Sequence, residues 1–234
     1  MKILALDTSA KTASVALTDG RRLIAANTLN AGLTHSETLL PMVVSLLSDA
    51  NTAVDDVDMF ACTVGPGSFT GVRIGVSVVK GLAYGKNKVC VGVSTLEALA
   101  RNIDNDGIIV PVMDARRSRL YRAVFRKENG VLTRLTEDDA KSVDEIAAEI
   151  SEYGHDIYFV GDGYDIISGA FASTKETPEP LRCSNAYSIA AAALEKYEKA
   201  DDAERKKMCD TLLFPEYLRP SQAERTLTSK GVIL

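Results

Sequence analysis

A glycine-rich stretch of twelve residues is the part of this sequence that most directly suggests chemistry. Residues 64–75 read Val-Gly-Pro-Gly-Ser-Phe-Thr-Gly-Val-Arg-Ile-Gly, after an apolar run at 59–64 and before a helical pattern over 72–84. A strand, a tight turn and a helix N-terminus place backbone N–H groups where they can bind an anion. The structural alternative is a turn whose glycines only permit positive φ angles.

Composition limits the classes of function that the whole chain can have. It has 234 residues, of which 46% are hydrophobic and 25% charged, with a net charge of -5 and a pI of about 5.2. Such a chain forms one or two globular domains and does not bind polyanions through its bulk charge. No apolar run approaches the ~18 residues of a membrane span, and the apolar N-terminal run is too short for a signal peptide.

Cysteine and histidine usage predicts a cytoplasmic protein without a metal site. The four cysteines form no CxxC pair, and Cys62 and Cys90 lie in strand-like runs, which is typical of buried thiols in a reducing compartment. The two histidines, His35 and His155, are far apart in the sequence. A histidine-rich metal site is therefore not expected.

The first half of the chain alternates strands and helices. Hydrophobic periodicity predicts strands at 3–7, 13–18, 22–28, 59–64 and 89–93, with helices at 36–50, 72–84 and 95–102. Ser36 is the predicted N-cap of the first helix, and Pro41 should kink its first turn or mark its regular start. The order is an antiparallel hairpin added to a strand, followed by βαβα.

The second half repeats part of this pattern. Strands are predicted at 108–114, 120–126, 131–135 and 157–160, and helices at 143–151 and 188–198. Two related α/β domains, 1–103 and 108–220, fit this better than one long sheet. Residues 221–234 lack a clear period and are predicted to form a C-terminal arm.

Several motifs together resemble the TsaB (YeaZ) family. They are Asp7-Thr8-Ser9 after the first strand, His35-Ser36-Glu37 opening a helix, the glycine-rich stretch, Met113-Asp114-Ala115-Arg116-Arg117, and Pro215-Glu216-Tyr217-Leu218-Arg219. The likeness is dense over residues 1–127 and thin beyond them. It implies an actin/Hsp70-like ATPase (ASKHA) fold, an α/β fold of two related domains.

The resemblance also implies a role in making N6-threonylcarbamoyladenosine at position 37 of tRNAs that read ANN codons. It implies a non-catalytic scaffold that dimerises with the catalytic paralogue TsaD, a TsaE-like ATPase that joins them, and a homodimer when the chain is alone. Contact with tRNA would occur only through the complex. TsaC-like enzymes would supply the threonylcarbamoyl-adenylate.

The sequence itself bears on whether this chain is the catalyst. TsaD-like proteins carry His-x-Glu-Gly-His on the helix after the strand that follows the glycine-rich turn, and two histidines one turn apart can hold a metal. Here Thr95 and Leu99 stand at those two places. Leucine cannot ligate a metal, so we expect no catalytic metal and no threonylcarbamoyl transfer by this chain alone.

Nucleotide binding is a separate question. In ASKHA ATPases, acidic, hydroxyl and glycine residues of the first hairpin hold phosphate and Mg²⁺, and the possible contacts here are Asp7, Thr8, Ser9, Gly161 and Gly163. The segment after Ser9 lacks the glycine that permits close approach to phosphate. Asp7 could equally cap backbone N–H groups, and the turn at Gly161 is a common one. We expect no cofactor of its own, with ATP or ADP held only in the assembled complex.

Two helices, predicted at 36–50 and 72–84, are expected to form the partner interface. The second contains Gly75 and Gly81, and each interior glycine costs a helix roughly 1 kcal/mol relative to alanine, so close packing must stabilise it. The first is apolar over more than half its circumference, which suggests burial on two sides. Packing on the chain's own sheet is the alternative. The resemblance assigns the interface to His35, Leu39, Leu40, Val43, Leu46, Leu47, Gly71, Val72, Gly75, Val78 and Leu82.

A basic cluster lies within twelve residues of the second half: Arg116, Arg117, Arg119, Arg122, Arg126 and Lys127. The first three could contact tRNA phosphates in the complex. A solvated strand face paired with Glu137, Asp138 and Asp139 is the alternative.

Two classes of function remain open at this point. One is the non-catalytic scaffold, and the other is a self-contained ASKHA-type ATPase or a glycoprotease-like peptidase. No serine or cysteine is flanked by a recognisable base, which disfavours a serine or cysteine peptidase.

Overall fold

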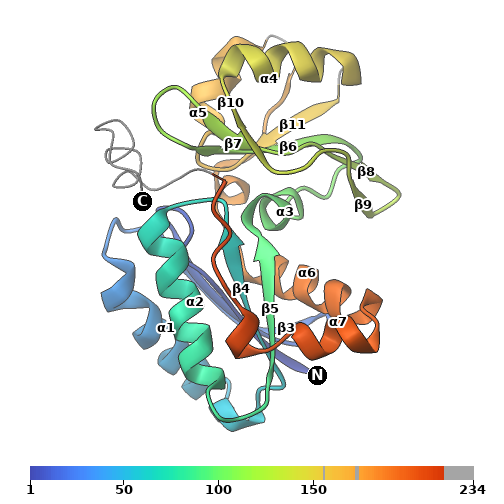
Figure 1. Cartoon of the computed structure of the whole chain (residues 1–234). Coiled ribbons are helices and arrows are strands. Elements are labelled where there is room, and N and C mark those ends of the chain that lie inside the picture. The colour runs from blue at the N-terminus through green and yellow to red at the C-terminus, as the bar shows by residue number, and fades with distance from the viewer. Residues whose placement is uncertain (155, 172–173, 219–234) are drawn as a thin grey trace, which may run out of the picture.

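Two β-sheets with helices packed on them organise the chain, one above the other in Figure 1. This computed structural model describes residues 1–154, 156–171 and 174–218. The predicted C-terminal arm at 221–234, the end of the predicted second domain at 219–220, and His155 lie outside these residues. Among the helices described, none is long and apolar enough to cross a membrane.

The first sheet has five strands in the order β3-β2-β1-β4-β5. Its first three strands are antiparallel, while β4 and β5 run parallel to β1, as the predicted hairpin and βαβ pattern require. The strands are β1 (Lys2–Asp7), β2 (Ala13–Asp19), β3 (Arg22–Leu29), β4 (Met59–Gly65) and β5 (Val89–Ser94).

Helices cover both faces of this sheet, which explains the uninterrupted apolar runs of β1 and β4. Leu4 and Leu6 face α1 (His35–Asp49) and α2 (Phe69–Ala83), whereas Ile3 and Ala5 face α6 (Ala186–Lys199). The sequence placed the start of α1 incorrectly. The N-cap is Thr34 rather than Ser36, and the helix runs from His35 through Pro41 without ending there.

The second sheet has seven strands, with β10-β7-β6-β11-β12 in order and the β8–β9 pair attached to β6. Its strands are β6 (Gly107–Asp114), β7 (Leu120–Arg122), β8 (Phe125–Glu128), β9 (Val131–Arg134), β10 (Asp139–Lys141), β11 (Ile157–Val160) and β12 (Thr174–Lys175). The other helices are α3 (Thr95–Ala100), α4 (Val143–Ile150), α5 (Tyr164–Ile167) and α7 (Asp202–Lys207). The 3-10 turns are η1 (Val54–Asp56), η2 (Ser151–Tyr153), η3 (Ser168–Ala170), η4 (Glu179–Arg182) and η5 (Asp210–Leu212).

The strand predicted at 120–126 is two strands. Val124 leaves the ladder because its N–H donates to Thr136 Oγ1 at 2.9 Å and its carbonyl accepts the Leu135 N–H at 2.8 Å. Consequently Ala123, Val124 and Phe125 are all buried, and the alternation expected across this segment is lost.

The last described part of the chain returns to the first sheet. Buried residues of α6 such as Ile189 and Ala193 share a core cluster with Ile3 and Ala16 of β1 and β2. The 108–220 boundary is therefore wrong at its C-terminal end, because α6 and the segment after it pack on the N-terminal unit. Periodicity located α6 but carried no information about which sheet it covers.

Residues 210–218, called the C-terminal strap here, run across α2 and the end of β4 (Figure 1). Its Tyr217 ring stacks on Phe69 with centroids 4.0 Å apart, and the Tyr217 hydroxyl accepts a hydrogen bond from Arg73 Nε at 2.6 Å. Its Glu216 N–H donates to the Val64 carbonyl at 2.7 Å. The strap is thus fixed to both the strand and the helix that flank the glycine-rich turn.

A buried ion pair stabilises the second sheet. Arg122 is 3% exposed, donates to Thr136 Oγ1 at 2.8 Å and pairs with Glu149 of α4, which also accepts Lys141 Nζ at 2.8 Å. A buried guanidinium needs this partner, because removing one member of such a pair leaves an unpaired buried charge.

We expect Glu149→Ala to lower the free energy of unfolding by about 3 kcal/mol, since it strands the Arg122 charge. Glu128→Ala, which removes the exposed partner of Arg126 at 3.9 Å, should change it by no more than ~0.5 kcal/mol. Urea denaturation followed by circular dichroism measures both. Equal effects of the two substitutions would contradict this account.

Candidate functional site

Three of the predicted nucleotide contacts, at the end of β1 and the start of the loop after it, are completely buried. Asp7, Thr8 and Ser9 are each at most 1% exposed. Asp7 Oδ1 accepts hydrogen bonds from Thr63 Oγ1 of β4 and from the Ser9 N–H at 3.2 Å. In this structure the Asp7 carboxylate therefore holds its own loop against β4, the capping role that the sequence left open.

The glycine-rich turn closes on that loop. A Cβ on Gly71 would collide with the Thr8 carbonyl oxygen, and a Cβ on Gly67 would lie 2.5 Å from the Ser9 carbonyl oxygen. The Ser68 N–H donates to the Ser9 carbonyl at 2.7 Å, and Thr8 Oγ1 donates to the Gly71 carbonyl at 2.7 Å. Because glycine has no side chain, Gly67 and Gly71 let the backbone of this turn contact the backbone of the loop after β1.

Two of the backbone donors at the start of α2 are used within the chain. Ser68 is the N-cap, and its Oγ accepts the Gly71 N–H at 3.2 Å while its own N–H is bound by Ser9. Gly67, at φ 159°, directs its Hα at Ser9. The alternative of a structural turn therefore explains Gly67 and Gly71 better than an anion site does.

Gly75 also faces inward, which corrects one argument for the interface. A Cβ at Gly75 would lie 2.9 Å from Thr8 Oγ1, so the glycine face of α2 packs on the β1 loop and not on another helix. A bulky residue at Gly75 would disturb this loop first and is no clean probe of partner binding. The interface role of the helix itself stays a prediction.

Most of the predicted interface residues also belong to the chain's own core. The buried ones are Leu39, Val43, Leu46, Leu47, Gly71, Val72 and Gly75. Val78 and Leu82 are half-buried against the same core.

His35 is half-buried as well, with Nε2 2.8 Å from the Ala10 carbonyl oxygen, so it fixes the start of α1 to the β1 loop. Of the predicted set, Leu40 is clearly exposed, at 49%.

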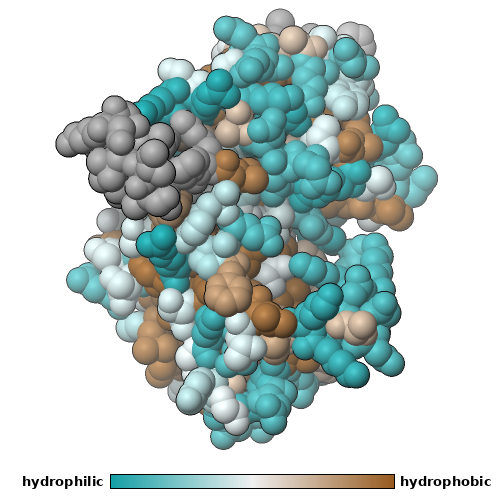
Figure 2. Space-filling view, viewed as in Figure 1, coloured by the Kyte–Doolittle hydropathy of each residue, from teal (hydrophilic) through white to brown (hydrophobic). Residues whose placement is uncertain are grey.

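The exposed apolar side chains on α1 include residues that the sequence argument missed. Val44 is 60% exposed one helical turn after Leu40, and Leu33 just before the helix is 57% exposed. Figure 2 shows apolar surface over α1 and over the C-terminal strap. The signal was present in the sequence, because a helix that is apolar around most of its circumference has apolar residues left for its outer side.

Of the two remaining nucleotide candidates, Gly161 lines a small cavity between the two sheets and Gly163 does not. This cavity, about 180 Å³, is lined by Gly161 and by residues of the β1–β2 loop such as Lys11, but not by Asp7, Thr8 or Ser9. Its volume is below the 300–1,000 Å³ typical of ligand pockets. The structure therefore does not bring the five candidates together.

Packing accounts for both glycines of that turn. A Cβ on Gly161, at φ 116°, would collide with the Val112 carbonyl oxygen, and one on Gly163 would lie 2.8 Å from Leu120 Cδ2. The Arg182 guanidinium lies over the Tyr164 ring at 3.5 Å and fills part of the same cavity wall. Asp162 is still exposed at this wall, yet the surrounding protein reduces its hydration enough to raise the pKa of its carboxyl.

Thr95 and Leu99 lie where the sequence comparison with TsaD placed two histidines. Both are on α3 and buried, and Leu99 Cδ1 lies 3.3 Å from the place of a Cβ on Gly161. Within the described ranges, no three His, Cys, Asp or Glu residues are arranged to hold a metal ion. These two buried positions border the same cavity, of about 180 Å³, beside the Gly161 turn.

The basic cluster is divided by the structure. Arg116 and Arg117 are exposed on a turn with φ angles of 64° and 56°, and Arg119 donates to the Ala140 carbonyl at 2.8 Å and pairs with Glu145 at 3.7 Å. Arg122 is buried, so the expected face shared by Arg122 and Arg126 does not exist. The alternative of pairs with Glu137, Asp138 and Asp139 is also wrong for Arg119 and Arg122, which pair with residues of α4.

Comparison with known proteins places this site in a family. Residues 29–227 match the family model "TsaD: tRNA N6-adenosine threonylcarbamoyltransferase". The chain is 36% identical to "tRNA threonylcarbamoyladenosine biosynthesis protein TsaB" of Bacillus subtilis over 69% of its length and 71% of that protein's. The chain belongs to the TsaB family. The Haemophilus influenzae TsaB protein is 31% identical to this TsaB-family chain, over 85% and 88% of the two lengths.

Solved structures agree. "YeaZ from Pseudomonas aeruginosa" matches this TsaB-family chain with a TM-score of 0.76 and 26% identity, over 93% of this chain and 99% of that one. The ethanolamine utilization protein EutJ from Carboxydothermus hydrogenoformans, at 17% identity and a TM-score of 0.51 over 82% and 90% of the chains, shows the fold alone. The predicted actin/Hsp70-like ATPase (ASKHA) fold and the predicted family are confirmed.

We expect Gly71→Ala to lower the free energy of unfolding by about 2 kcal/mol or more, because its Cβ has no space beside the Thr8 carbonyl. Gly81→Ala on the same helix has no atom within 4 Å of its Cβ and should raise it by up to ~1 kcal/mol. Thermal denaturation of the two variants measures the contrast. The same sign of change in both would refute the packing explanation.

Proposed function

We propose that this chain is the non-catalytic subunit that binds and activates a TsaD-like catalytic paralogue in the synthesis of N6-threonylcarbamoyladenosine. The product is the modified adenosine at position 37 of tRNAs that read ANN codons. Support comes from the names of its relatives, which are threonylcarbamoyladenosine biosynthesis proteins. The observation that carries the non-catalytic part is the closed contact between the β1 loop and the glycine-rich turn.

That contact removes the elements that an ASKHA ATPase uses to hold phosphate. The Thr8 and Ser9 carbonyls occupy the space beside Gly71 and Gly67, and the Ser68 N–H is already bound. A phosphate at this turn would have to displace the buried Thr8 and Ser9 backbone and break the hydrogen bond from the Ser68 N–H to the Ser9 carbonyl, at a cost of order 1–3 kcal/mol for each group left unpaired. Nucleotide is therefore proposed as a ligand of the assembled complex only.

The surface available for a partner is the outer side of α1. Leu40 and Val44 are one turn apart and exposed, and Leu33 extends the strip beyond the helix. A paralogue of the same fold presents a corresponding helix pair, so the two chains can pack helix against helix. When the paralogue is absent, the same strip can pair with a second copy of itself as an isologous homodimer.

The other components join through this dimer. A TsaE-like ATPase binds the pair, and tRNA is contacted by the complex, with the exposed arginines Arg116, Arg117 and Arg119 as the contacts from this chain. We propose a cytoplasmic location for all of them, as tRNA modification requires.

The alternative is a self-contained ATPase or a peptidase, and one solved relative from Pseudomonas aeruginosa is described by its similarity to "peptidase YEAZ". The structure disfavours Cys62 and Cys90 as nucleophiles. Burial raises the pKa of the Cys62 thiol, and burial raises the pKa of Cys90 to about 12, so both stay protonated at pH 7. Thr95 and Leu99 supply no ligand for a metallopeptidase.

We expect Leu40→Asp with Val44→Asp to weaken binding to the TsaD-like paralogue at least tenfold, because charges would enter an apolar contact. Val131→Asp, 64% exposed on β9 of the other sheet, should leave binding unchanged. Analytical ultracentrifugation measures both. Absence of any association of the unmodified chain at micromolar concentration would refute the scaffold role, and ATP turnover by the purified chain would support the alternative.

For the tRNA contact, Arg117→Glu should weaken tRNA binding by the complete complex and reduce the slope of log K against log salt by about 1. Arg126→Glu, on β8 away from the turn, is the control. Filter binding at several salt concentrations measures the slopes, and an unchanged slope for Arg117→Glu would remove this residue from the tRNA contact.

A further inference from the structure

One of the two edge strands of the first sheet is β5, at the opposite side from β3. The Cys90 N–H donates to the Met208 carbonyl at 3.0 Å, and the Gly92 carbonyl accepts Lys196 Nζ at 3.0 Å. Both residues therefore direct their backbone groups away from β4. Because a strand residue directs its N–H and its carbonyl to the same side, the Gly92 N–H also faces outward.

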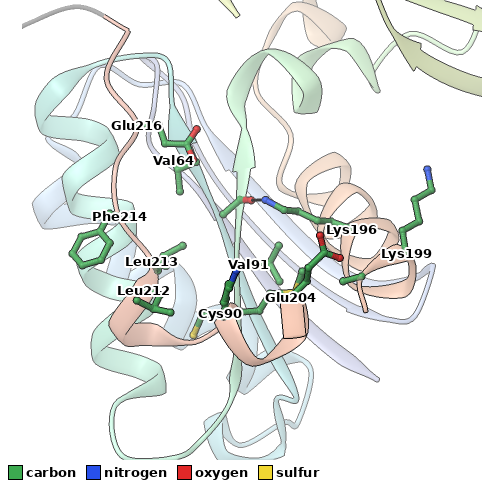
Figure 3. A pocket seen from close by; sticks show the side chains of 14 residues that line it. Val64, Cys90, Val91, Lys196, Lys199, Glu204, Leu212, Leu213, Phe214 and Glu216 are labelled. Atoms are coloured by element: carbon green, nitrogen blue, oxygen red, sulfur yellow. Dashed lines mark hydrogen bonds between the residues drawn. The ribbon is translucent and has the colours of Figure 1, made fainter. Parts of the chain in front are cut away.

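A cavity of about 590 Å³ lies along this edge, between β5, the end of α6, α7 and the C-terminal strap. Figure 3 shows Lys196 reaching from α6 to β5 on one side, with Leu212 and Leu213 of the strap on the other. Its lining residues are Val64, Cys90, Val91, Gly92, Lys196, Lys199, Ala200, Glu204, Lys207, Met208, Leu212, Leu213, Phe214 and Glu216. The volume is within the range of ordinary ligand pockets.

A second cavity of about 300 Å³ continues the first one past Gly92 to Ser94. The two cavities share five lining residues, which are Val64, Gly92, Lys196, Lys199 and Glu216. Together they form an open groove along Cys90–Ser94, a length of about 13 Å at the usual rise of a strand. A groove that follows a strand edge over this length suits an extended peptide better than a compact molecule.

Segments of the same chain already cover part of the β5 edge. Met208 makes one hydrogen bond to β5, Glu216 makes one to the Val64 carbonyl of β4, and Leu213 between them packs into the core. At Gly92 the covering group is a flexible lysine. Covering a strand edge with a helix is a known protection against pairing with other chains, and at Gly92 this cover is a single side chain of α6.

The charges around the groove favour an acidic occupant. Lys196, Lys199 and Lys207 line the main cavity against two glutamates, and Glu204 already accepts the Asp201 N–H at 3.0 Å in the cap of α7. The second cavity adds Glu97 and Glu195, which both pair with Arg101, at 2.8 and 2.9 Å. Within the described part of the chain, neither Lys196 nor Lys207 forms an ion pair, whereas Lys199 pairs with Glu195 at 2.5 Å. Two ammonium groups without a carboxylate partner border an apolar floor.

We propose that the β5 edge is a docking site for an extended, acidic segment of a partner protein, which adds to the sheet as a strand at Gly92. The segment's backbone pairs with the Gly92 N–H and carbonyl, its acidic side chains reach Lys196 and Lys207, and its apolar side chains lie in the cavity. This surface is separate from the outer side of α1, so two partners can bind at once.

The test uses an acetylated and amidated pentapeptide of alternating glutamate and valine, added to the isotopically labelled full chain. Saturable movement of the Gly92 amide signal in a ¹H–¹⁵N spectrum is expected. Two N-methylated versions, one on the valine and one on the glutamate nitrogens, separate strand addition from ion binding. A strand pairs along one edge, so one version should lose binding and the other should keep it.

Neighbouring lysines on α7 give matched variants. Lys207→Glu should weaken binding of the peptide about fivefold or more, while Lys206→Glu, which does not line the cavity, should change it less than twofold. Lys196→Glu should also weaken it.

Three results would overturn the proposal: a Gly92 signal that does not move at millimolar peptide, equal binding of both N-methylated peptides, or equal binding of a lysine–valine peptide. If hexanoate displaces the peptide, and N-methylation of the peptide does not change its binding, the groove is a site for small anions instead.

Discussion

The contact between the β1 loop and the first turn of α2 is the constraint on which the rest of the site depends. Two backbone segments approach so closely that only glycine fits at positions 67 and 71, and the hydrogen bonds of Thr8 and Ser68 hold them together. With this contact made, Asp7 is buried and α2 has a fixed start. The outer side of α1 is positioned in turn, because His35 attaches its first residue to the Ala10 carbonyl of the same loop.

The same contact distinguishes this chain from proteins of the same fold that hydrolyse nucleotides. A nucleotide-hydrolysing relative needs space and unsatisfied donors at the turn. Here the Thr8 and Ser9 carbonyls fill the space beside Gly71 and Gly67, and the Ser68 and Gly71 N–H groups are hydrogen-bonded within the chain. What remains for function is surface: an apolar strip on α1 and a half-covered strand edge at β5. The C-terminal strap lies between these two surfaces, joined to α2 through Tyr217 and bordering the β5 groove through Leu213.

Much of the fold could be predicted from the sequence, because strand and helix periods are local properties. The strand–turn–helix order around Pro66, the first hairpin and the β-α alternation all agree with the structure. The family was also accessible, since its motifs are dense in the first half.

The predictions that were wrong depended on which way a helix face points and on contacts between residues far apart in the sequence. The spacing of Gly71 and Gly75 identified one helix face but not that Thr8 lies against it. Arg122 looked like a surface charge because its partner Glu149 is on a later helix. The glycines at 161 and 163 looked like phosphate contacts because nothing local shows that the β6 backbone fills the space beside them.

The return of α6 to the first sheet has a consequence for how this chain can be made. On the ribosome, β1, β2 and β4 emerge well before α6, which covers Ile3, Ala16 and Met59. One face of the first sheet therefore stays apolar and uncovered until about residue 199 has left the exit tunnel. Contacts of such long sequence separation slow folding and expose the nascent chain to aggregation. Chaperone demand during synthesis should accordingly be concentrated on this one face of the sheet.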